Sequence, residues 1–258
     1  MRILLTNDDG IHAEGLVALE NIARALSDDI WICAPEYEQS GASRALTLSD
    51  PVRVRKLDPR RFATSGTPTD CVMLAIFELM EGAKPDLVLS GVNRGANLAE
   101  DVTLSGTVAG AIEGMAMGVP SIALSQTGWP TGNEDIFAPA EHFAPGIIAK
   151  LVETGWPKDV IINVNFPAAP VEKITEVEVT RQTFRDINVR HAEKRTDLRN
   201  RDYYWMGFRQ ERSSPADGTD LKAIYEGKIS VTPLHIDLTH LETVNRLKGV
   251  LGGTPPRA

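Results

Sequence analysis

The chain has 258 residues, of which 42% are hydrophobic and 24% are charged, as is usual for a globular protein with one sizeable core. The formal net charge of −8 argues against a nucleic-acid polymer or an anionic membrane as partner. No apolar run approaches the roughly 18 residues of a transmembrane helix, and the chain opens on a predicted strand without a leader pattern. Cys33 and Cys71 fall in apolar segments, where buried free thiols are expected. These features predict a cytoplasmic protein.

The first half of the chain opens with a β-α-β pattern. The apolar run of residues 3–5 predicts a buried strand, residues 15–26 have helical spacing, and residues 30–34 predict a second buried strand that Pro35 ends. This order implies a parallel pair joined by a right-handed crossover. Residues 52–55 alternate in polarity and predict an edge or antiparallel strand.

Further strands and helices continue the pattern as far as residue 164. Thr67, Pro68 and Asp70 form a helix-start signal, with a capping residue, a proline and an acid in the right places. Residues 85–91, 121–124 and 160–164 predict buried strands, with helices at about residues 106–118 and 139–152 between them. The pattern is that of a doubly wound, open and mostly parallel α/β sheet, with helices on both faces in three layers.

One predicted helix carries glycine at every fourth position, at residues 106, 110, 114 and 118. Each glycine costs roughly 1 kcal/mol of helix propensity relative to alanine. Because the glycines share one stripe, we expect that stripe to allow a close approach to a neighbouring element, most simply the sheet.

The composition changes near residue 177, so we divide one domain, residues 1–258, into a core of residues 1–176, an arm of residues 177–234 and a tail of residues 235–258. The arm is predicted to be a β-hairpin extension. It contains a basic segment, residues 181–212, with nine Lys or Arg against five Asp or Glu, and an aromatic strand at residues 202–207. An oligomer contact, a solvated basic face and contact with an anionic substrate are the three interpretations, of which we favour the first because clustered aromatics need burial.

Oxygen-bearing side chains follow three of the predicted strands. Asp8 and Asp9 follow the first strand, Ser40 follows the second, and Asn93 and Asn97 lie in the exit loop after residues 85–91. Ligands of open parallel sheets bind beyond the carboxyl ends of the strands, and an oxygen-only set suits Mg²⁺ or Mn²⁺ better than Zn²⁺. On the first turn alone, a solvated helix cap with a positive φ at the following glycine is an equal alternative.

A second candidate feature is the sequence Ser105, Gly106 and Thr107 at a predicted helix start. Free N–H groups and the positive end of the helix dipole bind phosphate there, although an ordinary helix cap has the same sequence. A cation opposite such a site would provide the two parts that phosphoryl transfer requires. No Walker sequence and no Gly-x-Gly-x-x-Gly after the first strand is present, which disfavours a dinucleotide cofactor.

Taken together, the motifs resemble the SurE family, the survival-protein-E type of metal-dependent nucleoside 5′-monophosphate phosphatase. The resemblance spans nearly the whole chain and is specific because its blocks occur in the right order. The blocks are residues 7–11, 38–41 with 46–47, 65–72, 90–97, 105–108 and 230–234.

The resemblance implies a Rossmann-like core and a 5′-nucleotidase that binds one divalent cation, Mg²⁺ or Mn²⁺, per subunit. Carried over residue by residue, the metal ligands are Asp8, Asp9, Ser40 and Asn93. The resemblance also implies a homodimer or homotetramer built through the C-terminal hairpin.

The catalytic groups are then Asp8 and Asp9, and the phosphate-binding residues are Asn97, Ser105, Gly106 and Thr107. Either a metal-activated water attacks the phosphate or one aspartate attacks first; we favour water. Short polyphosphate as the main substrate, supported by the basic segment, and a nucleotide-binding module with weak turnover remain as alternatives.

Overall fold

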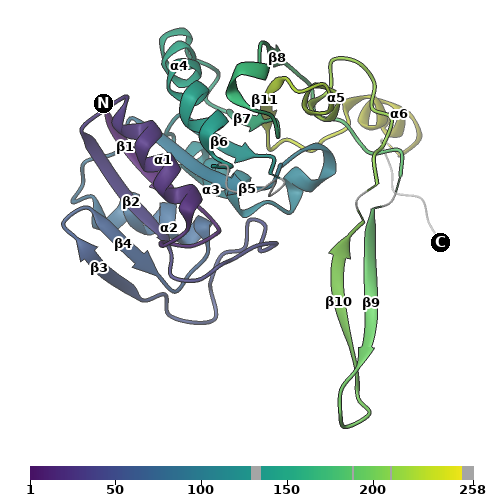
Figure 1. Ribbon diagram of the computed structural model, residues 1–258, viewed down its shortest axis with the longest axis horizontal. Helices are drawn as coiled ribbons and strands as arrows, with labels where there is room; N and C mark the ends of the chain where they lie inside the picture. Colours follow the sequence, from purple (N-terminus) through teal and green to yellow (C-terminus); the bar gives the residue numbers. More distant parts are fainter. Residues whose placement is uncertain (129–134, 188, 210, 252–258) are drawn as a thin grey trace.

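A mostly parallel sheet forms the centre of the protein in a computed structural model that describes residues 1–128, 135–187, 189–209 and 211–251 (Figure 1). Its nine strands lie in the order β3-β4-β2-β1-β5-β6-β7-β11-β8, and β9 and β10 form a separate two-stranded sheet. The strands are β1 (Arg2–Thr6), β2 (Asp29–Pro35), β3 (Val54–Asp58), β4 (Arg61–Thr64), β5 (Leu87–Arg94), β6 (Ser121–Gln126), β7 (Val160–Phe166), β8 (Val177–Val179), β9 (Arg190–Thr196), β10 (Asp202–Phe208) and β11 (Ile229–His235).

Helices cover both faces of the large sheet, which confirms the predicted three-layer α/β fold (Figure 1). The α-helices are α1 (Glu14–Arg24), α2 (Pro68–Leu74), α3 (Gly106–Ala116), α4 (Ala138–Thr154), α5 (Asp220–Tyr225) and α6 (Leu241–Leu251). A π-helical turn, Ala75–Leu79, extends α2, and short 3₁₀ turns span Ala99–Thr103 and Val171–Lys173. Within the described residues, no helix is both long enough and apolar enough to cross a bilayer.

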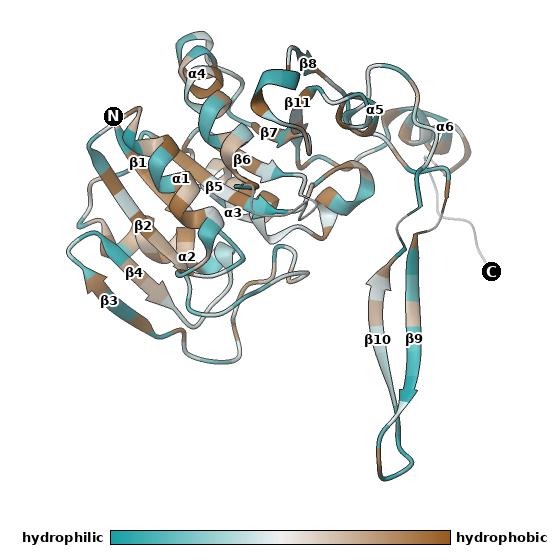
Figure 2. Cartoon of the chain, viewed as in Figure 1, coloured by the Kyte–Doolittle hydropathy of each residue, from teal (hydrophilic) through white to brown (hydrophobic). Residues whose placement is uncertain are grey.

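The sheet divides two apolar layers because successive side chains of a strand point to opposite faces. Ile3 and Leu5 pack with α1 and α4 on one face, whereas Leu4 packs with α2 on the other. Figure 2 shows the resulting concentration of hydrophobic residues along the central strands. The strand β1 lies between β2 and β5 and runs parallel to both, so the carboxyl ends of all three meet at one edge.

Two glycines of the predicted stripe, Gly110 and Gly114, face the sheet as predicted, whereas Gly118 lies beyond the end of α3. A Cβ added to Gly110 would lie 2.8 Å from Ser90 Oγ and 2.9 Å from Thr6 Cγ2. A Cβ on Gly114 would lie 2.4 Å from Ser121 Oγ. Such separations are far below a normal carbon contact, so glycine is required for α3 to lie this close to β1, β5 and β6.

Three local predictions in the first half of the chain are confirmed. Thr67 and Asp70 form a reciprocal capping box at the start of α2, with Pro68 in the first turn. The strand β3 is an edge strand that pairs antiparallel with β4. Both cysteines are free and buried.

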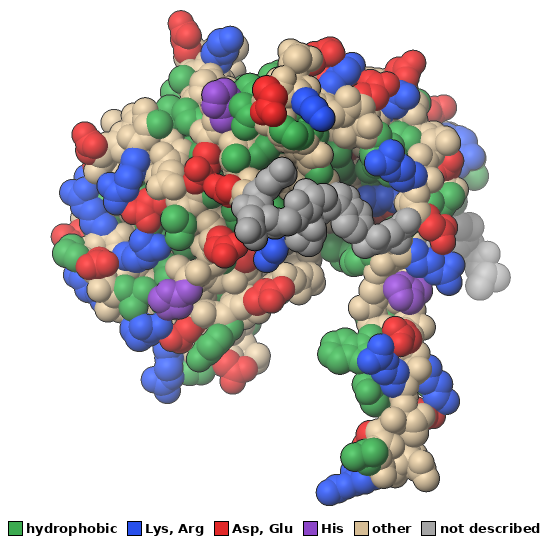
Figure 3. All heavy atoms as spheres, viewed as in Figure 1, with side chains coloured by type: hydrophobic (Ala, Val, Ile, Leu, Met, Phe, Trp, Pro, Cys, Tyr) green, Lys and Arg blue, Asp and Glu red, His purple; other side chains and the backbone are tan. Residues whose placement is uncertain are grey.

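The arm predicted for residues 177–234 comprises the edge strand β8, the hairpin of β9 and β10, the helix α5 and the strand β11. Only residues 190–208 form a hairpin, in which β9 and β10 pair antiparallel and project away from the body (Figures 1 and 3). The strand β11 instead joins the large sheet between β7 and β8, antiparallel to β7 and parallel to β8. Of the predicted tail, residues 241–251 form α6, and residues 252–258 lie outside the described residues.

Candidate metal and phosphate site

The turn after β1 places Asp8 and Asp9 at the carboxyl edge of the sheet. Asn7 Nδ2 donates to Gly10 O at 2.9 Å, and Gly10 has a φ of +107°, which an L side chain rarely adopts. The turn therefore has a fixed shape before α1 begins. Asp8 is 4% exposed, whereas Asp9 is only half-buried.

Three neighbouring segments donate hydrogen bonds to these two aspartates. The Gln39 N–H donates to Asp8 O at 2.7 Å, the Arg94 N–H approaches Asp9 Oδ2 at 3.4 Å, and Thr107 Oγ1 donates to Asp8 Oδ1 at 2.5 Å. Each donor is, or is directly adjacent to, a residue that the sequence places in the site. The structure thus gathers the turn after β1, the loop after β2, the end of β5 and the start of α3 at one place.

Ser40 and Asn93 lie beside those donors, and their side chains make local contacts. The exposed Ser40 donates from Oγ to Glu38 Oε1 at 2.7 Å, and Asn93 Nδ2 donates to Gly95 O at 2.8 Å. The carbonyl oxygen of the Asn93 amide is therefore the atom that could act as a ligand. Asn93 was predicted in an exit loop, but β5 continues to Arg94 after a register shift between Ser90 and Asn93. Periodicity could not detect that irregularity.

The start of α3 lies directly against Asp8. Ser105 is the N-cap and its Oγ accepts from the Val108 N–H at 3.0 Å. A Cβ on Gly106 would be 2.7 Å from Asp8 Cβ, so the missing side chain is what allows the contact. The first N–H groups of a helix have no intrahelical acceptor and carry a partial positive charge, which suits an anion at this position.

Burial sets the electrostatics of the pair. Burial raises the pKa of Asp8 to about 6; the Thr107 hydrogen bond opposes this shift and the charge of Asp9 adds to it. Burial also raises the pKa of Asp9, with the Arg94 N–H opposing the shift and Glu38 adding to it. The charge of Arg94 compensates Asp9 only in part, because the pKa of Asp9 is still raised, and a bound cation would supply further positive charge to the pair.

The donor set is compatible with a hard divalent cation. Asn7 Oδ1 is buried and has no hydrogen-bond partner, so the site also has an unused oxygen. Across the described residues, no three His, Cys, Asp or Glu side chains are grouped to hold a metal. A cation would therefore take two carboxylates together with neutral oxygens, the pattern that Mg²⁺ and Mn²⁺ tolerate and Zn²⁺ does not favour.

Asn97 lies in the exit loop after β5, as predicted, but it is buried against β6 and β7. Its side-chain Nδ2 donates to Ser125 Oγ at 2.8 Å, and its main chain is bonded to Asn163 and Asn165 of β7. Sequence analysis did not single out these two strand asparagines. Their signal was present, because two amides in an apolar strand need buried partners.

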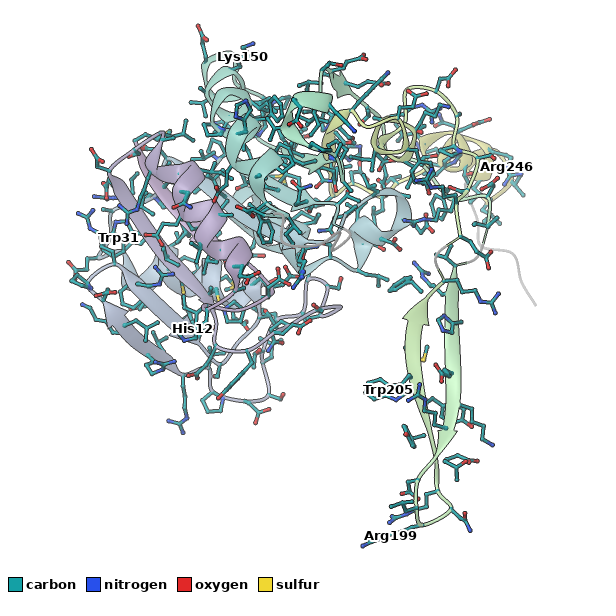
Figure 4. The ribbon with its side chains drawn as sticks, in the orientation of Figure 1. His12, Trp31, Lys150, Arg199, Trp205 and Arg246 are labelled. Carbon is teal, nitrogen blue, oxygen red and sulfur yellow. The ribbon has the colours of Figure 1, made fainter. Side chains whose placement is uncertain are left out.

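His12, which follows the turn after β1, is exposed (Figure 4). Within the basic segment, Lys194 pairs with Asp202 and Arg195 with Glu193 along the hairpin itself, while Arg185 pairs with Glu100 and Asp101.

A Rossmann-like sheet with carboxylates at its carboxyl edge and a glycine-containing helix start beside them defines a class of phosphate-handling α/β proteins. The family model "Survival protein SurE" matches residues 3–189. The 5′-nucleotidase SurE of Phenylobacterium zucineum is 75% identical over 257 residues, covering 100% of both chains. That of Caulobacter vibrioides is 74% identical over 260 residues, covering 100% of this chain and 98% of the relative.

A solved structure agrees with these relatives. The SurE protein from Aquifex aeolicus superposes with a TM-score of 0.84 at 37% identity, covering 97% of this chain and 99% of that one. The chain belongs to the SurE family, as its motifs predicted.

Proposed function

We propose that this protein is a metal-dependent phosphatase that hydrolyses nucleoside 5′-monophosphates to nucleoside and phosphate. The observation that carries the proposal is the position of Asp8, which is buried against both Asp9 and the first turn of α3. The proposed cation site and the proposed phosphate site are therefore adjacent, because Asp8 borders both. The full-length relatives are named 5′-nucleotidase SurE, which supports the same activity here.

We assign one divalent cation per subunit, Mg²⁺ or Mn²⁺, to Asp8, Asp9, Ser40 and Asn93. Metal dependence is a property of the family, and the oxygen-only donor set supports this assignment. When bound, the cation supplies positive charge that polarises the phosphoryl group. Thr107 orients the Asp8 carboxylate through its hydroxyl, so that the second Asp8 oxygen is available as a ligand.

The chain's own groups would bind and orient the phosphate. We assign the phosphate to the N–H groups at the start of α3, Gly106 and Thr107, with Ser105 capping the helix; the Thr107 N–H also interacts with Asp8. Asn97 adds an amide donor, because only one of its two Nδ2 hydrogens is used by Ser125. We favour water as the nucleophile, since burial and the Thr107 bond leave the Asp8 carboxylate restrained.

The decisive experiment measures phosphate release from AMP and GMP with Mg²⁺ or Mn²⁺, with and without a chelator. We expect chelation or Asp8→Asn to reduce the rate by at least about a hundredfold. Undiminished release in either condition would contradict the metal mechanism. Tight nucleotide binding without release under any metal would instead favour a binding module.

The substrate alternative is tested in the same assay with tripolyphosphate beside AMP. The basic segment that supported polyphosphate is largely engaged in its own ion pairs, which favours the nucleotide. A higher kcat/KM for tripolyphosphate than for AMP would reverse this ranking.

We also propose that the hairpin of β9 and β10 mediates a homodimer or homotetramer. Five apolar side chains of β10 are exposed, and Figure 4 shows Trp205 extending away from the ribbon. These are Tyr203, Tyr204, Trp205, Met206 and Phe208. An isolated two-stranded ribbon gains little stability by itself, so burial against another copy accounts for such a surface.

A further inference from the structure

One peptide unit near the site is held by side chains from a distant strand. The Asn97 N–H donates to Asn165 Oδ1 at 2.9 Å, and Asn165 Nδ2 donates back to Asn97 O at 3.1 Å. Asn163 Nδ2 donates to the same carbonyl oxygen at 2.9 Å. Both β7 asparagines are 0% exposed.

These asparagines occupy positions where the rest of β7 is apolar. Residues two apart in a strand share a face, so Asn163 and Asn165 present their amides together. Burying an amide without a partner is unfavourable, so two such residues in one interior strand are costly unless they are bonded. The bonds they make go to the main chain of Asn97, 66 and 68 residues away along the chain.

The side chain of Asn97 is oriented by β6, the strand that lies between β5 and β7. Its Nδ2 donates to Ser125 Oγ at 2.8 Å, and Ser125 lies on β6 opposite Asn93 of β5. The main-chain N–H, the main-chain carbonyl and one Nδ2 hydrogen of Asn97 are thus all held by hydrogen bonds. The second Nδ2 hydrogen keeps a defined direction without being used in these bonds.

We infer that Asn163 and Asn165 are positioning residues that act through Asn97. They hold its peptide unit so that its amide meets the phosphate of the substrate at a set place. The inference rests on the proposed function, because Asn97 must bind phosphate for its position to matter. Neither strand asparagine touches the substrate itself.

A double-mutant cycle tests the inference, because the bonds to Asn97 involve only its main chain. Asn97→Ala removes the amide but leaves the contacts with β7 in place. We expect Asn165→Ala to lower kcat/KM for AMP about tenfold to a hundredfold in the natural chain. In the Asn97→Ala background the same substitution should cost less than about twofold, since the group being positioned is gone.

A binding measurement separates placement from general damage. Inorganic phosphate is titrated into the Mn²⁺-loaded protein by calorimetry, and Mn²⁺ binding is followed separately by electron paramagnetic resonance. Phosphate affinity should fall in Asn165→Ala and, by a smaller factor, in Asn163→Ala, which removes one bond instead of two. The Mn²⁺ affinity should be unchanged. If either Asn165→Ala or Asn163→Ala does not fold, the other variant still tests the inference.

Thr232→Val is the matched control. Thr232 is a buried hydroxyl on β11 directly opposite Asn163, but its bonds go to Thr180 and Ser230. It should lose thermal stability without a change in kcat/KM or phosphate affinity. Equal losses of kcat/KM from Asn165→Ala in both backgrounds, or the same kinetic loss in Thr232→Val, would overturn the inference. No effect of Asn97→Ala alone would instead overturn the assignment of Asn97 to phosphate.

Discussion

At the scale of single residues, Asp8 must be ionised to bind a cation, but its buried position opposes ionisation. The carboxyl is buried beside a second acid, and burial raises its pKa to about 6. In the unfolded chain the carboxyl has an ordinary pKa of 3.8. Below about pH 6 the metal-free folded state keeps Asp8 protonated, so stability is lost as pH rises from about 4 to 6, and the full loss persists above pH 6.

Asp8→Asn should accordingly stabilise the metal-free protein at pH 8, by about 1–3 kcal/mol. Because the folded pKa is raised, the difference should shrink as pH falls from 6 towards 4 and vanish below the unfolded pKa. Urea denaturation at several pH values, with chelator present, measures it. A variant that is less stable than the natural chain at pH 8 would contradict this reading of the site.

Cation binding should have the opposite pH dependence. A proton on Asp8 competes with the metal, so the Mn²⁺ affinity should fall as pH drops below about 6. Titration with Mn²⁺ between pH 5 and 8, followed by electron paramagnetic resonance, measures this. An affinity that is independent of pH over that range would show that Asp8 is not a ligand.

Sequence reasoning located the segments of the site but not their internal connections. The aspartates, Ser40 and Asn93 could be placed because parallel strands end at one edge. Two hydrogen-bonded contacts could not be predicted: the bond from Thr107 to Asp8 and the bonds between β7 and the Asn97 main chain. Both depend on how two elements pack together, which residue spacing along the chain does not encode. The strand asparagines also matched no ligand motif, so their partners could be identified only from the fold.

At the scale of elements, α3 shows that close packing and helix propensity can conflict. The stripe of glycines brings the helix onto the sheet and its first turn against Asp8. A period of four along a helix predicted that face, so this feature was accessible from the sequence. The helix α4 also contains a glycine, Gly146, but a Cβ there would meet nothing within 4 Å.

The two helices therefore provide a paired prediction. Gly146→Ala should raise the free energy of unfolding by about 0.5–1 kcal/mol, because alanine has the higher helix propensity and no clash follows. Gly110→Ala should lower it by about 1–3 kcal/mol, because Ser90 and Thr6 must move. Chemical denaturation of both variants measures the difference. Stabilisation in both would contradict the close approach of α3.

At the scale of the whole molecule, the hairpin projects from the body of the protein, so packing within the body does not account for its exposed apolar side chains. Its exposed side chains lie on a ribbon whose two strands pair only with each other. The clustered aromatics of residues 202–207 predicted one strand of the ribbon. The placement of β11 in the large sheet could not be predicted, because an antiparallel strand that returns between two earlier ones leaves no local signal.

Substitution on the hairpin should change the assembly but not the fold. Trp205→Ser is expected to shift the protein to a smaller species at micromolar concentration, because the residue is 60% exposed in the single chain and its loss removes apolar contact area. Sedimentation velocity measures the change. Phe77→Ser is the control, since Phe77 is an aromatic of 62% exposure outside the hairpin. An unchanged sedimentation profile for Trp205→Ser, or an equal shift in both variants, would count against the proposed contact.

The insertion of β11 between β7 and β8 also dictates an order of events as the chain is made. Among the described residues, β8 pairs with β11 alone in the large sheet, yet β11 leaves the ribosome about fifty residues after it. The strands β1 to β7 can assemble during synthesis, whereas β8 must wait unpaired. The base of the hairpin lies in the segment between β8 and β11. It therefore takes its final position only after these two strands have paired. The proposed assembly through the hairpin would therefore start from a base that takes its final position only when β11 has joined the sheet.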